Sequence, residues 1–359
     1  MTVIPEFWRN RRVLLTGHTG FKGAWLSLWL QKLGAEVVGY ALPAPTEPSL
    51  FELAQVGTGM VSEIGDIRDL PHLLLVMRRH RPEIVIHMAA QPLVRASYED
   101  PVGTYATNVM GSVNLLEAVR QQEDVAAALV ITTDKCYSNS GSLWGYREFE
   151  PMGGHDPYAS SKGCAELVTA AYRTSYFATT AGRRGGKPVS VATARAGNVI
   201  GGGDWAKDRL VPDILAAFDS QQEVVVRCPN AVRPWQHVLD PLAGYLTLIQ
   251  KLHGNGDTFA EAWNFGPAPE SERPTRDLVD MMSALWGRGA GWRLHEGYSP
   301  HEDAVLRLDC SKARQRLGWT PRLTLQETLR WTIDWHNGYR SGADCHALTM
   351  AQIAAFQDQ

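Results

Sequence analysis

The sequence lacks the long apolar segments that mark membrane and secreted proteins. Its longest apolar runs are far shorter than the ~20 residues that a membrane-spanning helix needs. Its first residues, MTVIPEFWRNRR, contain no apolar core of a signal peptide. We therefore expect a cytoplasmic protein that has no membrane partner.

Cysteine is scarce, and its spacing argues against the usual cysteine sites. The five cysteines lie far apart, without the paired spacing of zinc ligands, and their odd number does not favour a disulfide framework. They are Cys136, Cys164, Cys228, Cys310 and Cys345. We expect structural thiols and no metal site.

The chain also lacks an excess of charge of either sign. Its 35 lysines and arginines nearly balance 38 aspartates and glutamates among 359 residues, which argues against broad binding to nucleic acid or to an anionic membrane. There is no internal repeat at solenoid spacing. A small-molecule partner is therefore expected, and the length suggests two domains or one domain with a large extension.

What the sequence does contain is an alternation of apolar runs with helical patterns. The apolar runs that predict strands are 12–15, 36–41, 84–88, 128–131 and 189–194. The helical patterns between them are 24–34, 69–80, 104–121 and 158–177. This order predicts an α/β fold with a Rossmann-type doubly wound parallel sheet. We assign residues 1–200 to this dinucleotide-binding domain and 201–359 mainly to a smaller mixed C-terminal substrate-binding lobe, from which a strand can still join the first sheet.

A glycine turn lies between the first expected strand and the first expected helix. Gly17, Gly20 and Gly23 have GxxGxxG spacing, which lets backbone N–H groups approach a pyrophosphate at a helix N-terminus. The spacing alone is weak evidence, because a glycine turn can serve only the packing of a strand against a helix. Its position at the first strand–helix junction favours a cofactor site.

The segment after the second expected strand carries no marker of either common dinucleotide. That strand ends at residues 40–42 without the carboxylate that usually binds the adenosine ribose of NAD. Equally, no lysine or arginine stands between Lys32 and Arg68 to bind the 2′-phosphate of NADP. We predict NAD, held with fewer ribose contacts, and we place Asp66 and Ile67 near its adenine.

Tyr158 and Lys162 form a YxxxK motif on an expected helix. Their spacing of four places the phenol and the ammonium on one face, where the ammonium would lower the tyrosine pKa toward that of a general base. YxxxK is frequent by chance, and by itself it is better interpreted as a surface pair. Thr133, which stands earlier at an expected strand end, and the glycine turn together favour a catalytic role.

These motifs together resemble the extended short-chain dehydrogenase/reductase superfamily. The resemblance rests on the glycine turn, HMAAQ at 87–91, TNVMG at 107–111, Thr133 and the Tyr158/Lys162 motif, and it covers nearly the whole chain. More narrowly, the sequence resembles the nucleotide-sugar 4,6-dehydratases, and among them the branch that acts on CDP-glucose. The stretches that carry this likeness are GHTGFKGAWLSLWL, AAQPLVR, DKCY, DPYASSKGCAE, RAGNVIGGGDW, VRPWQHV and LDCSKA.

The resemblance implies a dehydration of CDP-glucose without net redox change, with NAD as the cofactor. The sugar is oxidised at C4, water leaves across C5 and C6, and the hydride returns to C6. The product, CDP-4-keto-6-deoxyglucose, would enter deoxysugar synthesis for lipopolysaccharide and O-antigen. The resemblance also implies that Tyr158 is the C4 base, that Lys162 holds the nicotinamide ribose, and that Thr133 hydrogen-bonds the C4 oxygen.

Asp134 and Lys135 supply what an elimination needs and a plain epimerase does not. Our hypothesis is that Asp134 protonates the leaving C6 hydroxyl and that Lys135 removes the C5 proton. The dTDP-glucose relatives carry Asp-Glu here, whereas the CDP-glucose branch resembles this chain in carrying Asp-Lys. The alternative is a solvated pair at a strand end. Desolvation and Lys162 would lower the Lys135 pKa while Asp134 would raise it, and the sequence leaves this balance open.

The expected site residues form three groups. The catalytic residues are Thr133, Asp134, Lys135, Tyr158 and Lys162. The cofactor-binding residues are Gly17, Thr19, Gly20, Phe21, Lys22, Gly23, Asp66, Ile67, Ala89, Ala90, Gln91, Thr132, Tyr158 and Lys162. The substrate-binding residues are Gln91, Asn198, Arg209, Arg227, Arg233, His301 and Arg307. Arginine forks suit a diphosphate, although an ordinary surface arginine is the alternative, most of all for Arg307.

Two other functions and the assembly remain open. A nucleotide-sugar 4-epimerase would use Thr133, Tyr158 and Lys162 without the acid–base pair, and a non-catalytic NAD-sensing regulator would bind the cofactor without turnover. The segments 104–121 and 158–177 resemble those that pair across a two-fold axis in relatives, so we expect a homodimer or a higher homo-oligomer. Their apolar faces would equally serve an internal core.

Overall fold

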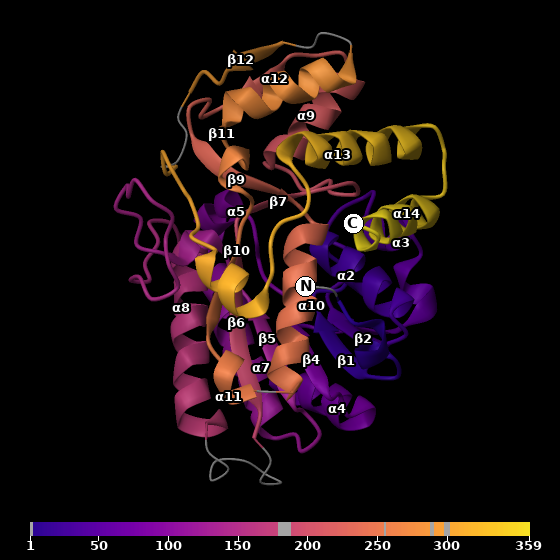
Figure 1. The fold of residues 1–359 in the computed structure, drawn as a ribbon, viewed down its shortest axis with the longest axis vertical. Helices are drawn as coiled ribbons and strands as arrows, with labels where there is room; N and C mark the ends of the chain where they lie inside the picture. Colours follow the sequence, from indigo (N-terminus) through magenta and orange to yellow (C-terminus); the bar gives the residue numbers. More distant parts are fainter. Residues whose placement is uncertain (1–2, 179–187, 255, 288–290, 298–301) are drawn as a thin grey trace.

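The protein folds into a large sheet covered by helices, with a smaller lobe at one end of the sheet (Figure 1). The structure is a computed structural model that describes residues 3–178, 188–254, 256–287, 291–297 and 302–359. Of the predicted site residues, His301 lies outside the described residues.

In the described part of the chain, the large sheet has seven parallel strands in the order β10-β6-β5-β4-β1-β2-β3. These strands are β1 (Arg12–Thr16), β2 (Glu36–Ala41), β3 (Val61–Ile64), β4 (Ile84–His87), β5 (Ala127–Ile131), β6 (Ser190–Ala196) and β10 (Ala262–Phe265). Most are nearly continuous apolar runs, as is typical of strands that are buried on both faces. The prediction of a Rossmann-type doubly wound parallel sheet is confirmed.

Helices cover both faces of this sheet because successive strand residues point to opposite faces. Along β5, Leu129 belongs to the core on one face and Val130 to the core on the other. The helices of the first face are α2 (Phe21–Lys32), α10 (Leu239–Gly254) and α14 (Cys345–Gln357). Those of the second face are α4 (Leu70–His80), α7 (Gly111–Arg120) and α8 (Pro157–Tyr172).

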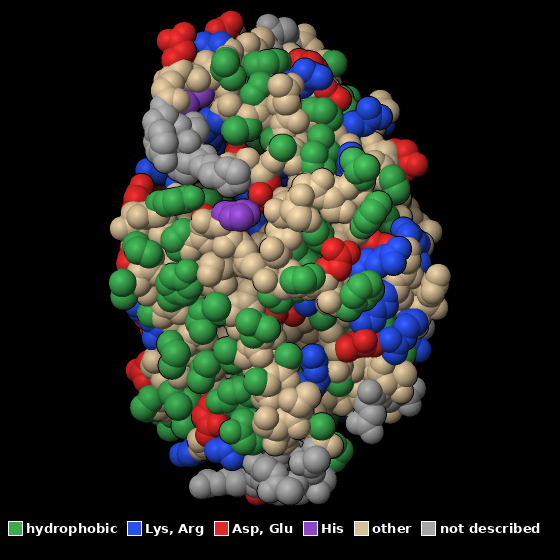
Figure 2. Space-filling view, turned by 90° about the vertical axis from the view of Figure 1, so that its left-hand side faces the viewer, with side chains coloured by type: hydrophobic (Ala, Val, Ile, Leu, Met, Phe, Trp, Pro, Cys, Tyr) green, Lys and Arg blue, Asp and Glu red, His purple; other side chains and the backbone are tan. Residues whose placement is uncertain are grey.

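The outer side of the second helix layer exposes several large hydrophobic residues. Val102 of α6 (Pro101–Tyr105), Met110 at the end of the π-helical turn Ala106–Met110, and Leu167 of α8 are 78%, 52% and 61% exposed. Hydrophobic side chains are frequent on the side of the molecule where α8 lies (Figure 2). This surface is therefore unlike the charged face that a solvated helix usually presents.

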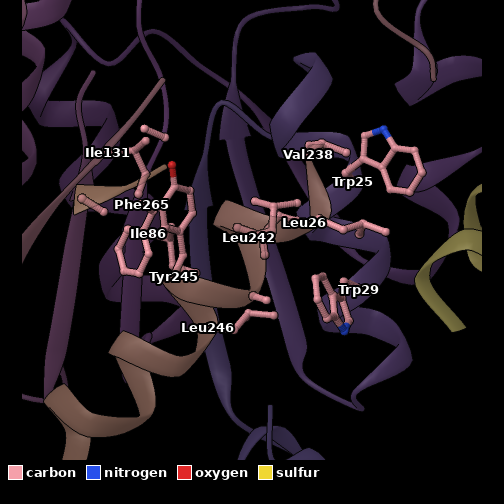
Figure 3. Close-up of a cluster of buried hydrophobic side chains, with 14 of the residues drawn as sticks. Trp25, Leu26, Trp29, Ile86, Ile131, Val238, Leu242, Tyr245, Leu246 and Phe265 are labelled. Atoms are coloured by element: carbon pink, nitrogen blue, oxygen red, sulfur yellow. The ribbon is translucent and has the colours of Figure 1, made fainter. Parts of the chain in front are cut away.

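The core on the first face is built from large aromatic and aliphatic side chains. Trp25 and Trp29 of α2, Tyr245 of α10 and Phe265 of β10 lie among the aliphatic residues of the sheet (Figure 3). All four are at most 1% exposed. Burial of each such side chain contributes roughly 1.5–3 kcal/mol, so this layer holds α2 and α10 firmly against the sheet.

The smaller lobe contains two short sheets and three helices in the described residues. One sheet has the order β11-β9-β7 with parallel and antiparallel pairs, and the other pairs β12 with β8. The strands are β7 (Asn198–Ile200), β8 (Val224–Val226), β9 (Val232–His237), β11 (Glu272–Pro274) and β12 (Trp292–Leu294). The helices are α9 (Leu210–Asp219), α12 (Thr275–Trp286) and α13 (Leu325–Arg340). This is the smaller mixed lobe that the sequence predicts.

The chain crosses between the two parts more than once. β7 follows β6 directly but pairs with β9 in the small lobe, and β10 returns to the edge of the large sheet. A domain boundary at residue 200 stays a prediction, because α10, β10 and α14 all lie beyond it and pack with the first part.

The remaining elements are short connections. They are α1 (Pro5–Trp8), α3 (Leu50–Leu53), α5 (Val94–Glu99), α11 (Gly256–Phe259), the 3₁₀ turns Val56–Gly59, Asp134–Cys136 and Pro269–Ser271, and the π-helical turns Arg173–Phe177 and Ala313–Leu317. Within the described ranges, no helix has the length and apolar character needed to span a membrane.

Candidate active site

A cavity of about 1020 Å³ lies where the carboxyl ends of the large sheet's strands face the smaller lobe. In open parallel sheets, ligands bind outside the carboxyl ends of the strands. Segments that follow β1, β2, β4, β5 and β6 line it from one side, and α9, β8 and β9 line it from the other. The volume is at the upper end for ligand pockets and suits two ligands placed side by side.

The glycine turn packs too closely for larger residues, yet it leaves the start of α2 open. Gly17 has a φ of +76°, and a Cβ there would lie 2.7 Å from the Ala89 nitrogen. A Cβ on Gly23 would lie 2.1 Å from the Gly17 oxygen, whereas one on Gly20 would meet nothing closer than 3.5 Å. Gly20 precedes α2 without a side-chain cap, so the first N–H groups of the helix are available to an anion. This cradle fits a dinucleotide pyrophosphate.

The predicted cofactor residues gather at the cavity with two exceptions. Those that line it are Gly17, Thr19, Gly20, Phe21, Lys22, Gly23, Asp66, Ile67, Ala89, Ala90, Thr132 and Tyr158. Gln91 and Lys162 are not among the lining residues. The Gln91 amide is used inside the chain, since its Nε2 donates to Leu93 O and Thr104 Oγ1 and its Oε1 accepts from Leu93 N.

The adenosine side of the cavity differs from what the sequence suggests. Asp66 lines the cavity, but its carboxylate is engaged by Arg68, whose hydrogen bond chiefly holds the pKa of Asp66 below its usual value. Glu47, in the loop after β2, also lines the cavity. Sequence reasoning missed Glu47 because it stands several residues beyond the strand end in a proline-rich loop without periodicity.

Helix α8 presents Tyr158 and Lys162 to the end of β5. Asp156 caps the helix by accepting from Ala159 N at 2.8 Å, and Pro157 occupies its first turn. Lys162 is 7% exposed, and its Nζ donates to Ile131 O at 3.1 Å. Lys162 of the motif therefore lies against the end of β5, two residues before Thr133.

Burial dominates the ionisation of both residues. It lowers the pKa of Lys162 to about 8 and raises the pKa of Tyr158 to about 12. A hydrogen bond with Thr133 and the charge of Arg209 act in the opposite direction on Tyr158 without cancelling the effect of burial. Lys162, which the sequence predicts to lower the Tyr158 pKa, is not among the groups that chiefly act on it in this structure.

A short 3₁₀ turn presents Asp134 and Lys135 to the cavity. Asp134 is 3% exposed, and its Oδ1 accepts from Thr133 Oγ1 at 3.0 Å. Among the described residues its buried Oδ2 has no hydrogen-bond partner, and burial raises the Asp134 pKa. Lys135 is half-buried beside it. The interpretation of a solvated surface pair is wrong for Asp134.

Lys22 adds a further cation near this group. Burial first, and then the charges of Lys162 and Arg209, lower the pKa of Lys22 to about 7, against an opposing effect of Asp134. The sequence places Lys22 in the cofactor turn, but it does not indicate that Lys22 would interact electrostatically with Lys162 and Asp134.

Three predicted substrate arginines line the cavity, each already paired with a carboxylate. The pairs are Arg209–Asp204 at 2.8 Å, Arg227–Asp208 at 3.0 Å and Arg233–Glu302 at 3.0 Å. The carboxylates come from loops, and sequence reasoning missed them for that reason.

Of the other predicted substrate residues, some line the cavity and some do not. Asn198 lines the cavity. Arg307 does not, because its Nε pairs with Glu272 at 2.9 Å and its Nη1 donates to Leu143 O at 3.1 Å. Among the residues that the structure describes, no cluster of His, Cys, Asp and Glu is arranged to hold a metal ion.

Comparison with known proteins finds a relative that matches almost the whole chain. A CDP-glucose 4,6-dehydratase from Salmonella typhimurium is 54% identical over 351 residues, which cover 98% of this chain and 97% of that protein.

Solved structures share the fold at lower identity. DesIV, a dTDP-glucose 4,6-dehydratase from Streptomyces venezuelae with NAD and TYD bound, aligns with a TM-score of 0.76 and 24% identity over 93% of this chain and 99% of that one. A UDP-glucose 4-epimerase from Thermotoga maritima, with UDP-glucose, aligns with a TM-score of 0.78 and 22% identity over 92% and 99% of the two chains.

A family model covers the sheet and most of the residues that line the cavity. The model of the NAD dependent epimerase/dehydratase family matches residues 13–266, from β1 to the end of β10. This range includes the glycine turn, the 3₁₀ turn with Asp134 and Lys135, and the Tyr158/Lys162 helix. The chain belongs to the NAD dependent epimerase/dehydratase family.

Proposed function

We propose that this chain is an NAD-dependent nucleotide-sugar 4,6-dehydratase, a hydro-lyase that converts CDP-glucose to CDP-4-keto-6-deoxyglucose and water. The observation that carries the proposal is the buried acid Asp134 and the base Lys135 in one cavity with Thr133 and Tyr158. The 54% identity to a CDP-glucose 4,6-dehydratase supports the same reaction and the cytidine nucleotide.

The residues around the start of α2 fit NAD. Its pyrophosphate would lie on the N–H groups after Gly20, with Asp66 and Ile67 toward the adenosine. Lys162, whose Nζ reaches the end of β5 at Ile131 O, would hold the nicotinamide ribose. Bound there, NAD would supply the hydride chemistry between C4 and C6 of the sugar.

Tyr158 and Thr133 act on the C4 hydroxyl. Tyr158 takes the hydroxyl proton as C4 is oxidised, and Thr133 holds the same oxygen by a hydrogen bond. The Tyr158 pKa of about 12 is too high for an efficient base at neutral pH. Positive charge near the phenol, which Arg209 supplies in this structure, is therefore needed to stabilise the phenolate when substrate is bound.

Asp134 and Lys135 carry out the elimination. Because burial raises the Asp134 pKa, this carboxyl holds a proton more readily than a solvated aspartate and can donate it to the leaving C6 hydroxyl. Lys135 takes the C5 proton, which the C4 ketone has made acidic. When the hydride returns to C6, the same lysine returns a proton to C5.

The paired arginines of the cleft bind the diphosphate. Arg209, Arg233 and Asn198 line the same cavity as the 3₁₀ turn with Asp134 and Lys135. A diphosphate would compete with Asp204 and Glu302 for these forks. We infer that the nucleotide lies toward the smaller lobe, residues 201–359, and NAD toward residues 1–200.

A substrate panel tests the proposal. CDP-, dTDP-, GDP- and UDP-hexoses are incubated with the NAD-loaded protein, and the products are analysed by mass spectrometry and by absorbance in alkali. We expect CDP-glucose to lose one water and to give a 4-keto product. Recovery of an isomer of unchanged mass would instead indicate a 4-epimerase, and no turnover of any nucleotide hexose would indicate an NAD-sensing regulator.

We also propose a cytoplasmic homodimer that serves deoxysugar synthesis for lipopolysaccharide and O-antigen. The support for a dimer is the exposed apolar surface formed by Val102, Met110 and Leu167, which lies on helices that pack against one another. Exposed apolar patches of this kind mark association surfaces.

A further inference from the structure

A buried ion pair lies behind the catalytic turn, which we define as Thr132–Tyr137. Arg195 of β6 donates to Glu166 of α8 through two hydrogen bonds, Nε to Oε1 at 2.9 Å and Nη2 to Oε2 at 2.8 Å. Both side chains are only 4% exposed. A buried pair of charges is stable only when its geometry is good and its other polar atoms are hydrogen-bonded. The hydrogen-bond partners of this pair therefore indicate which segments it holds in place.

Two of those partners are the two ends of the catalytic turn. Thr132 Oγ1 donates to Glu166 Oε1 at 2.5 Å. At the other end, Arg195 Nη1 donates to Tyr137 Oη at 2.6 Å, and its guanidinium carbon lies 4.8 Å from the centre of the Tyr137 ring. The turn that presents the acid and the base is therefore anchored at both ends to a single pair.

The pair also ties the turn to the rest of the sheet. Thr193 Oγ1 of β6 donates to Glu166 Oε2 at 2.7 Å, and Tyr137 Oη donates to Asn264 Oδ1 of β10 at 2.7 Å. Strands β6 and β10, helix α8 and the end of β5 are thus joined by one hydrogen-bonded network. Such networks fix a geometry more strongly than their single bonds suggest.

Glu166 stands one helical turn after Lys162 on α8, and its charge acts on the Lys162 ammonium. The groups that interact with Lys162 from the packed elements are Glu166 on α8, Cys136 on the catalytic turn, His87 on β4 and Lys22 on α2. Burial keeps Cys136 protonated and His87 neutral. Despite burial, the charge and hydrogen bonds of Arg195 keep the pKa of Glu166 below its usual value. Glu166 is therefore the ionised acid that favours the charged form of Lys162.

We propose that Glu166 and Arg195 are positioning residues of this active site. They hold the catalytic turn by both ends, and the carboxylate of Glu166 keeps Lys162 charged so that it can hold the nicotinamide ribose. The proposal rests on the proposed function for the roles of Lys162 and of the turn.

The first test measures NAD affinity against pH by calorimetry, with no sugar present. In the wild type we expect affinity to fall as Lys162 loses its proton near pH 8. Glu166→Gln keeps the shape but removes the charge, and it should move this fall to lower pH by about one unit. Thr193→Val removes one hydrogen bond to the same carboxylate but leaves its charge, so the fall should stay at the wild-type pH. An unchanged pH dependence in a folded Glu166→Gln variant would overturn the charge role.

The second test separates positioning from charge, and it stands even if Glu166→Gln does not fold. Thr132→Val and Tyr137→Phe each release one end of the turn while the Glu166–Arg195 pair remains. We expect kcat with CDP-glucose to fall about 10-fold or more, with KM and the pH dependence of NAD affinity unchanged.

The matched control is Thr169→Val, a buried threonine of the same helix whose hydroxyl donates within the helix, to Ala165 O. It should keep its kcat within about twofold of the wild type, since surrounding packing is retained. Wild-type kcat in both turn variants would refute the positioning role. If the wild type did not turn over CDP-glucose, the proposed function would fail, whereas the calorimetric comparison would still decide the role of Glu166.

Discussion

At the scale of the residue, burial gives the two members of the acid–base pair different environments. Asp134 accepts a hydrogen bond from the Thr133 hydroxyl, and its other carboxylate oxygen has no partner among the described residues. Lys135 is half-buried beside it. A raised pKa suits an acid that must deliver a proton to a leaving hydroxyl. Asp134 can thus act as the acid of the elimination and Lys135 as its base, whereas an Asp–Lys pair on a solvated surface would lack this difference in environment.

Replacement of Lys135 by methionine tests this division. Oxidation at C4 needs Tyr158 and the cofactor but not Lys135, so reduced nicotinamide should accumulate on the variant without release of the 4-keto-6-deoxy product. Loss of a general base lowers the rate of its step by about 10²- to 10⁴-fold. The absorbance of reduced nicotinamide and the mass of the product report the two steps separately.

The matched control is Lys32→Met, an exposed lysine at the end of α2. We expect it to make product at the wild-type rate. Product formation by Lys135→Met at a near wild-type rate would mean that another group removes the C5 proton.

At the scale of the element, the sequence predicted what depends on local pattern. β1, β2, β4, β5 and β6 follow the predicted apolar runs closely, and α8 spans most of its predicted range. The sequence pattern could not predict that Glu166 and Arg195, which are 29 residues apart, would form an ion pair behind the catalytic turn. Nor could it show the carboxylates that pair with the cleft arginines, because loop residues carry no periodicity and their contacts depend on the tertiary fold.

The start of α10 offers a prediction about stability. Asp240 is 1% exposed in the first turn, accepts from Arg322 N at 2.7 Å through Oδ1, and has no partner for Oδ2 in the described part of the chain. Burial raises its pKa from 3.8 to about 7. The folded state therefore binds this proton more tightly than the unfolded chain does. The resulting stabilisation is full below pH 3.8 and is lost as the pH rises through about 7.

Asp240→Asn should flatten this dependence. Between pH 4 and pH 8, the free energy of unfolding of the variant relative to the wild type should rise by on the order of 3 kcal/mol. Urea unfolding at a series of pH values measures this difference. Asp334→Asn, at an exposed position on α13, is the control and should leave the pH dependence unchanged. Parallel pH curves for wild type and Asp240→Asn would show that Asp240 does not titrate differently in the two states.

At the scale of the whole molecule, the cavity joins two parts that neither the glycine turn nor the YxxxK motif alone would place together. The large sheet contributes the cofactor cradle and the catalytic turn, and the smaller lobe contributes Arg227 and Arg233. The exposed apolar surface of α6 and α8 lies on the outside of these helices, and Tyr158 and Lys162 belong to one of them. Dimerisation through that surface would stabilise the helix that presents both side chains.

Leu167→Asp tests the dimer. Leu167 is 61% exposed in the single chain, so an aspartate there should leave the fold intact. In a dimer the carboxylate would lie in an apolar interface, and burial of an unpaired charge costs several kcal/mol. We expect light scattering to give twice the chain mass for the wild type and the mass of one chain for the variant. Leu75→Asp is the control, because Leu75 is 53% exposed on α4, away from α8 (Figure 1), and it should remain dimeric. A dimeric Leu167→Asp variant would exclude this surface as the interface.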